Sequence, residues 1–222
     1  MNFLRWAPAR PLAFAVLSFV GAGSALAGGH VISIAEARTR PLGSVVTVDG
    51  SVTTPSGVFE SSFFDQGFAL QDRTAGIYVS VPQSLGLAPR AQARVTGTLA
   101  DSFGLLILVP ANPAQDVKPH GVGPKVRPRL LRTGSVNEAS EGLLVRSVGT
   151  ITQAPSSDLP YGYKFSIDDG SGELTIFVNV QTGIDLSGLA VGQVVSVTGF
   201  SSQFDTHYEI DPRGPDDVVV AD

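Results

Sequence analysis

The stretch VVTVDGSVT at residues 45–53 decides the fold, because a related stretch, LVRSVGTIT, returns at residues 144–152. In the first copy, valines and a glycine alternate with polar residues, which is the period-two pattern of a strand with one buried face. Gly50 and Gly149 stand at the same place in the two copies. A glycine inside a strand indicates a bend or a bulge in a curled sheet. The sequence therefore predicts the same bent strand in each half of the chain.

Three more pairs of segments extend this repeat. FALQD at 68–72 and IYV at 77–79 are matched by FSIDD at 165–169 and IFV at 176–178, and ARVTG at 93–97 is matched by VSVTG at 195–199. Each half thus contains a bent strand, a hairpin and further strands, which predicts a five-stranded barrel. We predict an all-β fold with two tandem barrels, residues 28–117 and 133–222, joined by a linker at residues 118–132.

A short helix is expected before each barrel. Ser33 is followed three residues later by Glu36, which is the capping-box pattern at the start of a helix that we expect to run to about Arg38. Ser135 and Glu138 repeat the pattern before the second barrel. Each helix is expected to close one end of its barrel.

The first 27 residues have the features of a cleavable secretory signal peptide. Arg5 and Arg10 precede an apolar run from Leu12 to Val20, and small residues lead to the sequence ALA at 25–27. The apolar run is about half of the ~20 residues that a membrane-spanning helix needs. We expect cleavage after Ala27 and a periplasmic or secreted protein. The chain has no cysteine, so its barrels must be stable without disulfides.

Charge is distributed unevenly along the chain. Residues 28–117 contain five basic and seven acidic residues, residues 118–132 contain five basic and no acidic residues, and residues 133–222 contain three basic and thirteen acidic residues. Prolines at 119, 124 and 128 predict that the basic linker is extended and semi-stiff. Three interpretations stay open for it: contact with a phosphate backbone, packing against the acidic second barrel, or simple solvation.

The order of a short helix, a bent strand, a hairpin and two further strands resembles the oligonucleotide/oligosaccharide-binding (OB) fold. The resemblance is carried by LGSVVTVDG at 42–50, FALQD at 68–72 with GIYV at 76–79, and VTGTL at 95–99. The resemblance covers both halves of the chain. The two halves are similar to the OB domains that accompany bacterial extracellular nucleases. The resemblance implies ligand binding on the face of the second and third strands and at two flanking loops. No residues remain for a nuclease domain, so we expect a non-catalytic protein without a cofactor.

The first barrel and the linker are the predicted nucleic-acid site, because single strands bind to aromatic side chains within a positively charged groove. The second barrel also has aromatic candidates, at Tyr161, Tyr163, Phe177, Phe204 and Tyr208, but its thirteen acids should repel a polyanion. The candidate nucleic-acid-binding residues are Phe64, Arg73, Tyr78, Arg94, Phe103, Lys118, Lys125, Arg127, Arg129 and Arg132.

Other chemistries have weaker sequence support. There is no cysteine, no G-x-S-x-G motif and no P-loop, and the histidines are His30, His120 and His207. DDGSGE at residues 168–173 is interpreted as a hairpin turn rather than part of a calcium loop. His207, Glu209 and Asp211 alternate and share a strand face, which we interpret as solvated rather than metal-binding.

The sequence therefore favours an exported binding protein for single-stranded nucleic acid. A protein- or oligosaccharide-binding accessory module is the alternative, and a metal-dependent phosphoesterase is a second alternative.

Overall fold

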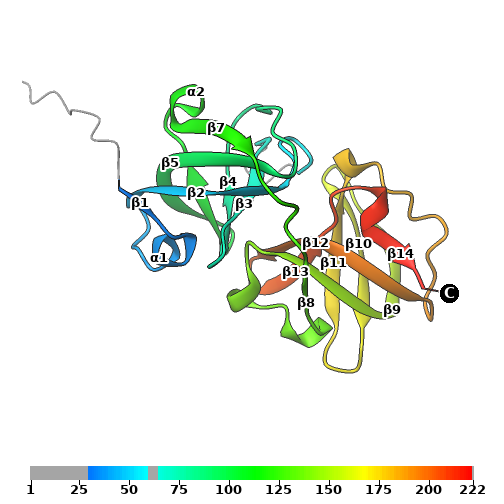
Figure 1. Ribbon diagram of the computed structural model, residues 1–222. Coiled ribbons are helices and arrows are strands. Elements are labelled where there is room, and N and C mark those ends of the chain that lie inside the picture. Colours follow the sequence, from blue (N-terminus) through cyan, green and yellow to red (C-terminus); the bar gives the residue numbers. More distant parts are fainter. Residues whose placement is uncertain (1–29, 60–64, 222) are drawn as a thin grey trace, which may run out of the picture.

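The computed structural model of the protein describes residues 30–59 and 65–221. The predicted signal peptide and Phe64 lie outside these described residues. Two β-barrels lie side by side, and the segment that joins them crosses the front of the molecule in the view of Figure 1. In the described part of the chain, no helix has both the length and the hydropathy of a membrane span.

The first sheet closes on itself. Its strands run in the order β1-β2-β3-β4-β6-β5-β7, and β2 also pairs with β5, so that β2, β3, β4, β6 and β5 form a closed barrel. The pairing of β4 with β6 is parallel. The elements are β1 (Val31–Ile32), α1 (Ile34–Arg38), β2 (Val45–Thr54), β3 (Phe68–Gln71), β4 (Gly76–Val79), β5 (Ala91–Ser102), β6 (Leu105–Val109), α2 (Pro113–Asp116) and β7 (Val117–Val122).

The second sheet repeats this arrangement. Its order is β14-β12-β13-β11-β10-β9-β8, with an additional pairing of β12 with β9 that closes the barrel, and β11 pairs with β13 in parallel. The strands are β8 (Arg129–Leu130), β9 (Leu144–Asp158), β10 (Gly162–Asp168), β11 (Leu174–Asn179), β12 (Val194–Phe204), β13 (His207–Asp211) and β14 (Val218–Val220). Four short 3₁₀ helices complete it: η1 (Thr133–Ser135), η2 (Glu138–Ser140), η3 (Val180–Thr182) and η4 (Pro215–Asp217). The predicted all-β class and the five-stranded barrels are confirmed.

Gly50 and Gly149 stand at equivalent positions in the two barrels for a steric reason. A Cβ atom on Gly50 would lie 2.7 Å from the carbonyl oxygen of Gln71, and one on Gly149 would lie 3.0 Å from the carbonyl carbon of Asp168. A side chain at position 50 would force the hairpin backbone to move, and one at position 149 would be tightly crowded, so glycine lets the bent strand approach its hairpin closely.

The sequence alignment of the hairpins is wrong by two residues. Phe68 pairs with Val79 in the first barrel, whereas its counterpart Phe165 pairs with Ile176 in the second. Val79 therefore corresponds to Ile176 and not to Val178. Side chains alternate with a period of two, so a shift of two residues leaves the pattern of buried and exposed positions unchanged.

Only the first predicted helix is an α-helix. Ser33 caps α1 by accepting a hydrogen bond from the Glu36 amide at 3.1 Å, as predicted. The segment before the second barrel instead forms the 3₁₀ turns η1 and η2, and the capping box there is made by Asn137 and Ser140 rather than by Ser135 and Glu138. The second prediction is wrong because the caps stand two residues further along the chain.

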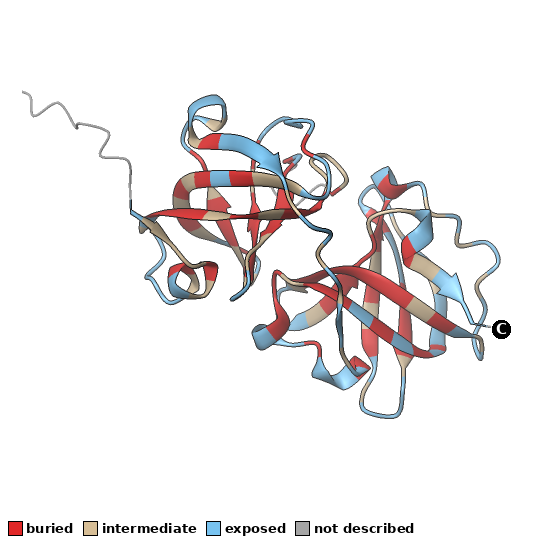
Figure 2. Cartoon of the chain, in the orientation of Figure 1, coloured by how far each residue is buried: buried red, intermediate tan, exposed pale blue. Residues whose placement is uncertain are grey.

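The predicted linker is shortened at both ends by strand pairing. β7 continues to Val122 and pairs with β5, while β8 pairs in parallel with the start of β9. Residues 123–128 are left between the two sheets. Each barrel has its own apolar core, seen as the runs of buried residues along the strands in Figure 2. Val48, Leu70 and Val95 belong to the first core. Ile167 and Val197 belong to the second.

Candidate functional site

The two barrels are in direct contact. A Cβ atom on Gly76 would lie 1.9 Å from the carbonyl oxygen of Gly142, so the two backbones touch at this point. Arg38 of α1 pairs with Glu141 at 2.9 Å. The Leu144 amide donates to the side-chain oxygen of Gln71, also at 2.9 Å. These polar contacts fix the orientation of one barrel against the other.

An apolar cluster completes this interface. Phe200 of β12 is 1% exposed and belongs to a cluster that otherwise consists of residues of the first barrel. Its ring centroid lies 6.1 Å from that of Phe59 and 5.8 Å from that of Tyr78. Buried aromatic contacts of this kind contribute about 0.5–1.5 kcal/mol each beyond the area that they remove from water.

A cavity of about 800 Å³ lies beside this cluster, between the barrels. The first barrel contributes Phe59, Tyr78, Ser102, Phe103 and Leu105 to its wall. The second barrel contributes the outer faces of its strands β9 to β13. Its lining includes Gln153, Ser156, Asp158, Tyr161, Lys164, Ser166, Glu173, Thr175, Phe177, Ser202, Phe204, His207, Glu209 and Asp211.

Equivalent rows of side chains cross the five strands of each barrel, and they differ in character. The registers place Thr54, Ala69, Tyr78, Ile107 and Ala100 in one row of the first barrel. In the second barrel they place Gln153, Ser166, Thr175, Glu209 and Ser202 in the matching row. The first row is mainly apolar and packs in the cluster around Phe200. The second row is wholly polar and lines the cavity.

Glu209 and Asp211 are buried, and the interpretation of their strand face as solvated is wrong. Each is 7% exposed, because the first barrel covers that face of β13. Burial is the main cause that raises the pKa of Glu209, with a further contribution from the charge of Asp158. The pKa of Asp211 is raised well above its usual value by burial and by Glu209. The alternation in the sequence correctly placed the three side chains on one face. It could not show that the first barrel buries this face.

Tyr78 is not available for stacking on a base. It is 2% exposed, and its hydroxyl group donates a hydrogen bond to the Asp65 carboxylate at 2.9 Å. Burial, together with Asp65, raises the pKa of Tyr78 well above its usual value. The predicted role of Tyr78 as a nucleic-acid contact is therefore contradicted by its place in the interface.

Phe103 lies at the edge of the cavity. It stands in the tight turn between β5 and β6 and is 54% exposed. Its ring stacks on Phe204 with centroids 5.6 Å apart and planes inclined by 19°. The Asp205 amide donates to the Phe103 carbonyl oxygen at 2.6 Å, which joins the hairpin tips of the two barrels. Phe103 is separated from the predicted cation Arg94, which is nine residues away along the chain, or roughly 30 Å of extended strand.

The predicted cations of the first barrel lie on its outer surface. Arg94 and Lys118 are register partners on β5 and β7, so their side chains are neighbours. Arg94 pairs with Asp49 at 3.1 Å, and His120 contacts the same carboxylate at 3.0 Å. Arg73 is exposed in the turn between β3 and β4. These residues do not join Tyr78 and Phe103 in a single groove.

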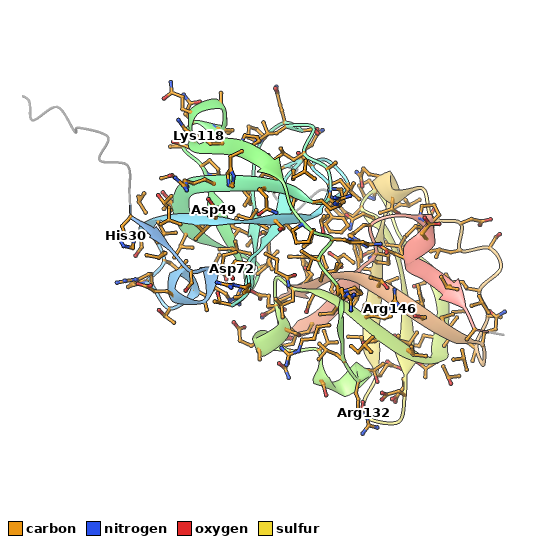
Figure 3. The ribbon with its side chains drawn as sticks, viewed as in Figure 1. His30, Asp49, Asp72, Lys118, Arg132 and Arg146 are labelled. Carbon is orange, nitrogen blue, oxygen red and sulfur yellow. The ribbon has the colours of Figure 1, made fainter. Side chains whose placement is uncertain are left out.

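The cations of the linker lie along one extended course. Lys118, Lys125, Arg127 and Arg129 are exposed, and within residues 30–59 and 65–221 none of them has a carboxylate oxygen within 4 Å. Arg132 pairs with Asp169 at 3.4 Å. In Figure 3, Lys118 lies on the first barrel, Arg146 near the middle of the molecule and Arg132 at the far end of the second barrel.

Hydrogen bonds to its backbone hold the linker segment to both barrels. The Arg90 side chain donates to the Gly123 carbonyl oxygen at 3.1 Å, and the Leu131 amide donates to the Arg146 carbonyl oxygen at 2.9 Å. The linker cations are therefore spread over a fixed path, and among the described residues only Arg132 forms an ion pair with the acidic second barrel. Exposed cations along an extended segment can contact the phosphates of a nucleic-acid backbone.

The acidic turn at residues 168–173 is a hairpin turn, as predicted. Asp168 accepts hydrogen bonds from the amides of Gly170 and Gly172, at 2.7 and 3.2 Å. Asp169 accepts from Ser171 and from the Thr133 hydroxyl group, which together hold its pKa well below the usual range. The described residues contain no group of three or more His, Asp or Glu side chains arranged to hold a metal ion.

Comparison with known proteins shows similarity to a bacterial protein in sequence and to several distant structures. No protein-family model matches the chain. Endonuclease YhcR of Bacillus subtilis (strain 168) is 28% identical over 197 residues, which cover 85% of this chain and 16% of the relative. The chain thus corresponds to about a sixth of that protein's length.

The similar solved structures cover most of the chain at low scores. A murine DNA-binding protein bound to double-stranded DNA is 13% identical, with a TM-score of 0.43 over 79% of this chain and 96% of that one. The p204 HINb domain is 13% identical, with a TM-score of 0.37 over 77% and 93%. The tetrameric p202 HIN2 is 10% identical, with a TM-score of 0.36 over 81% and 93%. Scores this low do not establish a common fold.

Proposed function

We propose that this protein is a non-catalytic module that binds single-stranded nucleic acid through its linker surface, defined as Lys118, Lys125, Arg127, Arg129 and Arg132 with the adjoining Arg94. One observation carries the proposal. Four of these cations are exposed and lack a carboxylate partner among the described residues. Unpaired cations on an ordered path can each displace a counterion from a phosphate backbone, which is the main source of affinity without base contacts.

We further propose that both barrels are OB domains. The closed order of strands 1-2-3-5-4 and the parallel pairing of the third and fifth strands support this assignment. The similarity to endonuclease YhcR over most of this chain supports a role beside nucleic-acid chemistry. We place the protein outside the cytoplasm, in the periplasm or secreted, on the basis of the expected signal peptide.

The proposed surface differs from the usual OB ligand face. In the first barrel that face is covered by Phe200, and in the second barrel it lines a cavity with four carboxyl groups and a single lysine. A polyanion would be repelled from the cavity, because charges of one sign at short distance oppose each other strongly in a partly buried site. The linker surface avoids this repulsion.

A fluorescence titration with a labelled single-stranded oligonucleotide tests the proposal. The wild-type protein should bind at about 50 mM salt and lose affinity steeply towards about 200 mM. The variant Lys125→Ala/Arg127→Ala/Arg129→Ala should bind about tenfold more weakly or worse, and its dependence on log salt should be shallower by about two. Absence of binding to the wild-type protein at low salt would refute the proposal.

A matched single substitution separates the linker from charge in general. Arg127→Ala and Arg40→Ala each remove one exposed cation, but Arg40 lies after α1 and pairs with Glu36 at 2.6 Å. Only Arg127→Ala should weaken binding. Equal losses in the two variants would indicate attraction by overall charge and would contradict a defined linker surface.

A further inference from the structure

The cavity between the barrels contains two buried carboxyl groups without a basic partner of their own. Glu209 and Asp211 are each 7% exposed and stand two residues apart on the outer face of β13. The only lysine or arginine among the lining residues is Lys164, which is half-exposed and lies 3.9 Å from Asp158, and the lining histidine, His207, is exposed. A buried carboxylate without a nearby cation raises the free energy of the folded protein. A positively charged ligand in the cavity would compensate for this cost.

The hydrogen bonding of Asp211 points in the same direction. One of its carboxylate oxygens, Oδ1, is buried and has no hydrogen-bond partner among the described residues. Ser202 donates to the same carboxyl group. Among the described residues, Glu209 likewise makes no hydrogen bond to a side chain, although Thr175 and Ser202 are its register partners on the neighbouring strands. The carboxylate oxygens of Glu209 and Asp211 can therefore accept further hydrogen bonds from a donor in the cavity.

Aromatic rings line the same cavity. Phe103, Phe204 and Tyr161 are each between 43% and 54% exposed, and Phe177 of β11 also belongs to the lining. The face of an aromatic ring attracts a cation within about 6 Å, and the attraction grows when water is excluded. A volume of about 800 Å³ is in the range of pockets that enclose small organic ligands.

We propose that this cavity binds a small organic cation that carries primary or secondary ammonium groups, with Glu209 and Asp211 as its ion-pair partners. The ammonium groups would donate to the carboxylates of β13, and the methylene segments between them would lie against Phe177 and the stacked rings of Phe103 and Phe204. The four carboxyl groups of the lining outnumber its one lysine and favour a ligand with more than one positive charge. The site shares no residue with the linker surface.

Binding should be coupled to proton release. The pKa of Glu209 is raised to about 7, so part of this group is protonated at neutral pH, and an ammonium group beside it would favour the ionised form. The other titratable or charged groups that line the cavity are Asp158 of β9, Tyr161 before β10, Lys164 of β10, Glu173 before β11, His207 of β13 and Tyr78 of β4 with its partner Asp65. Affinity should therefore rise with pH through the neutral range.

Isothermal titration of the protein with spermidine tests this site. We expect saturable binding of one molecule per chain, stronger at pH 8 than at pH 5.5. The variant Glu209→Gln/Asp211→Asn, which keeps the shape of both side chains, should bind at least about tenfold more weakly. The control Asp185→Asn/Asp216→Asn removes the same charge from exposed positions of the same barrel and should bind like the wild type.

Each other outcome argues against the proposal. Equal losses in both double variants would mean that spermidine is attracted by net charge alone. Binding of maltotriose, or of MgCl₂ without spermidine, that is lost only in Glu209→Gln/Asp211→Asn would assign the cavity to a neutral sugar or to a metal ion. Thermal unfolding of each variant verifies that it is folded before its titration is interpreted.

Discussion

Ile107 and Glu209 occupy the same position in the two barrels. Ile107 pairs with Ala100 and Tyr78, and Glu209 pairs with Ser202 and Thr175, in the same antiparallel and parallel ladders. Ile107 is 1% exposed in the apolar interface, whereas Glu209 is 7% exposed in the cavity wall. One copy of the repeated barrel thus uses this face for packing, and the other keeps it polar.

Exchange of these two residues should have opposite effects. Ile107→Glu buries a carboxylate in an apolar cluster and should destabilise the protein by about 3 kcal/mol or more, because nothing there can compensate its charge. Glu209→Ile removes a buried carboxyl group and should leave stability unchanged or raise it at pH 8. Urea unfolding measures both effects, with Val122→Glu at a 75% exposed position as the control. Similar losses for Ile107→Glu and Val122→Glu would contradict the assignment of Ile107 to the interface.

The buried acids of β13 predict a defined pH dependence of stability. A carboxyl group whose pKa is raised on folding binds more protons in the folded than in the unfolded protein, so its contribution is present below pH 4.5 and is lost as pH rises to about 7. Glu209→Gln/Asp211→Asn should therefore be more stable than the wild type at pH 8, by on the order of 2–3 kcal/mol, with little difference at pH 4. Melting temperatures across this range test the sign. A variant that is less stable at pH 8 would contradict it.

Asp72 should stabilise the junction between α1 and the first hairpin. It accepts hydrogen bonds from the amides of Ile34, Thr74 and Ala75, at 2.9, 2.7 and 2.9 Å. Burial acts to raise its pKa, but these bonds and the Thr74 hydroxyl group lower it overall. Its contribution should thus be present above about pH 4 and lost as pH falls further. Asp72→Ala should cost about 1–2 kcal/mol at pH 7, measured by urea unfolding. Asp72→Asn should recover part of this loss, and equal losses for the two would contradict a capping role.

The contact of Gly76 with Gly142 should control the docking of the barrels. Gly76→Ala places a Cβ atom where the Gly142 carbonyl oxygen lies, and overpacking of this kind costs about 1–3 kcal/mol. We expect a larger radius of gyration by small-angle X-ray scattering and an earlier unfolding transition. Gly188→Ala is the matched control, because a Cβ atom there meets nothing within 4 Å. Unchanged scattering for Gly76→Ala would indicate that the barrels are not held by this contact.

The sequence predicted the fold better than the site. Alternation along residues 45–53 and 144–152 and the repeated glycines indicate barrel strands, because the period of two is a local property of a half-buried strand. The hairpin register was wrong by two residues, since that shift leaves every side chain on the same face. The candidate site mixed residues that the structure separates: Tyr78 belongs to the interface and Phe103 to the cavity, whereas the linker cations form a surface of their own.

By itself, the sequence determined the strands, the duplication and the contrast between a basic linker and an acidic second half, because each of these depends on neighbouring residues in the chain. The tertiary structure alone decided which outer face of each barrel is covered. Leu105, Ile107 and Val109 of β6 alternate as His207, Glu209 and Asp211 of β13 do. Alternation places three side chains on one face, but the approach of the other barrel decides whether that face meets water, an apolar partner or a cavity. That approach depends on contacts between residues far apart in the sequence, such as Gly76 with Gly142.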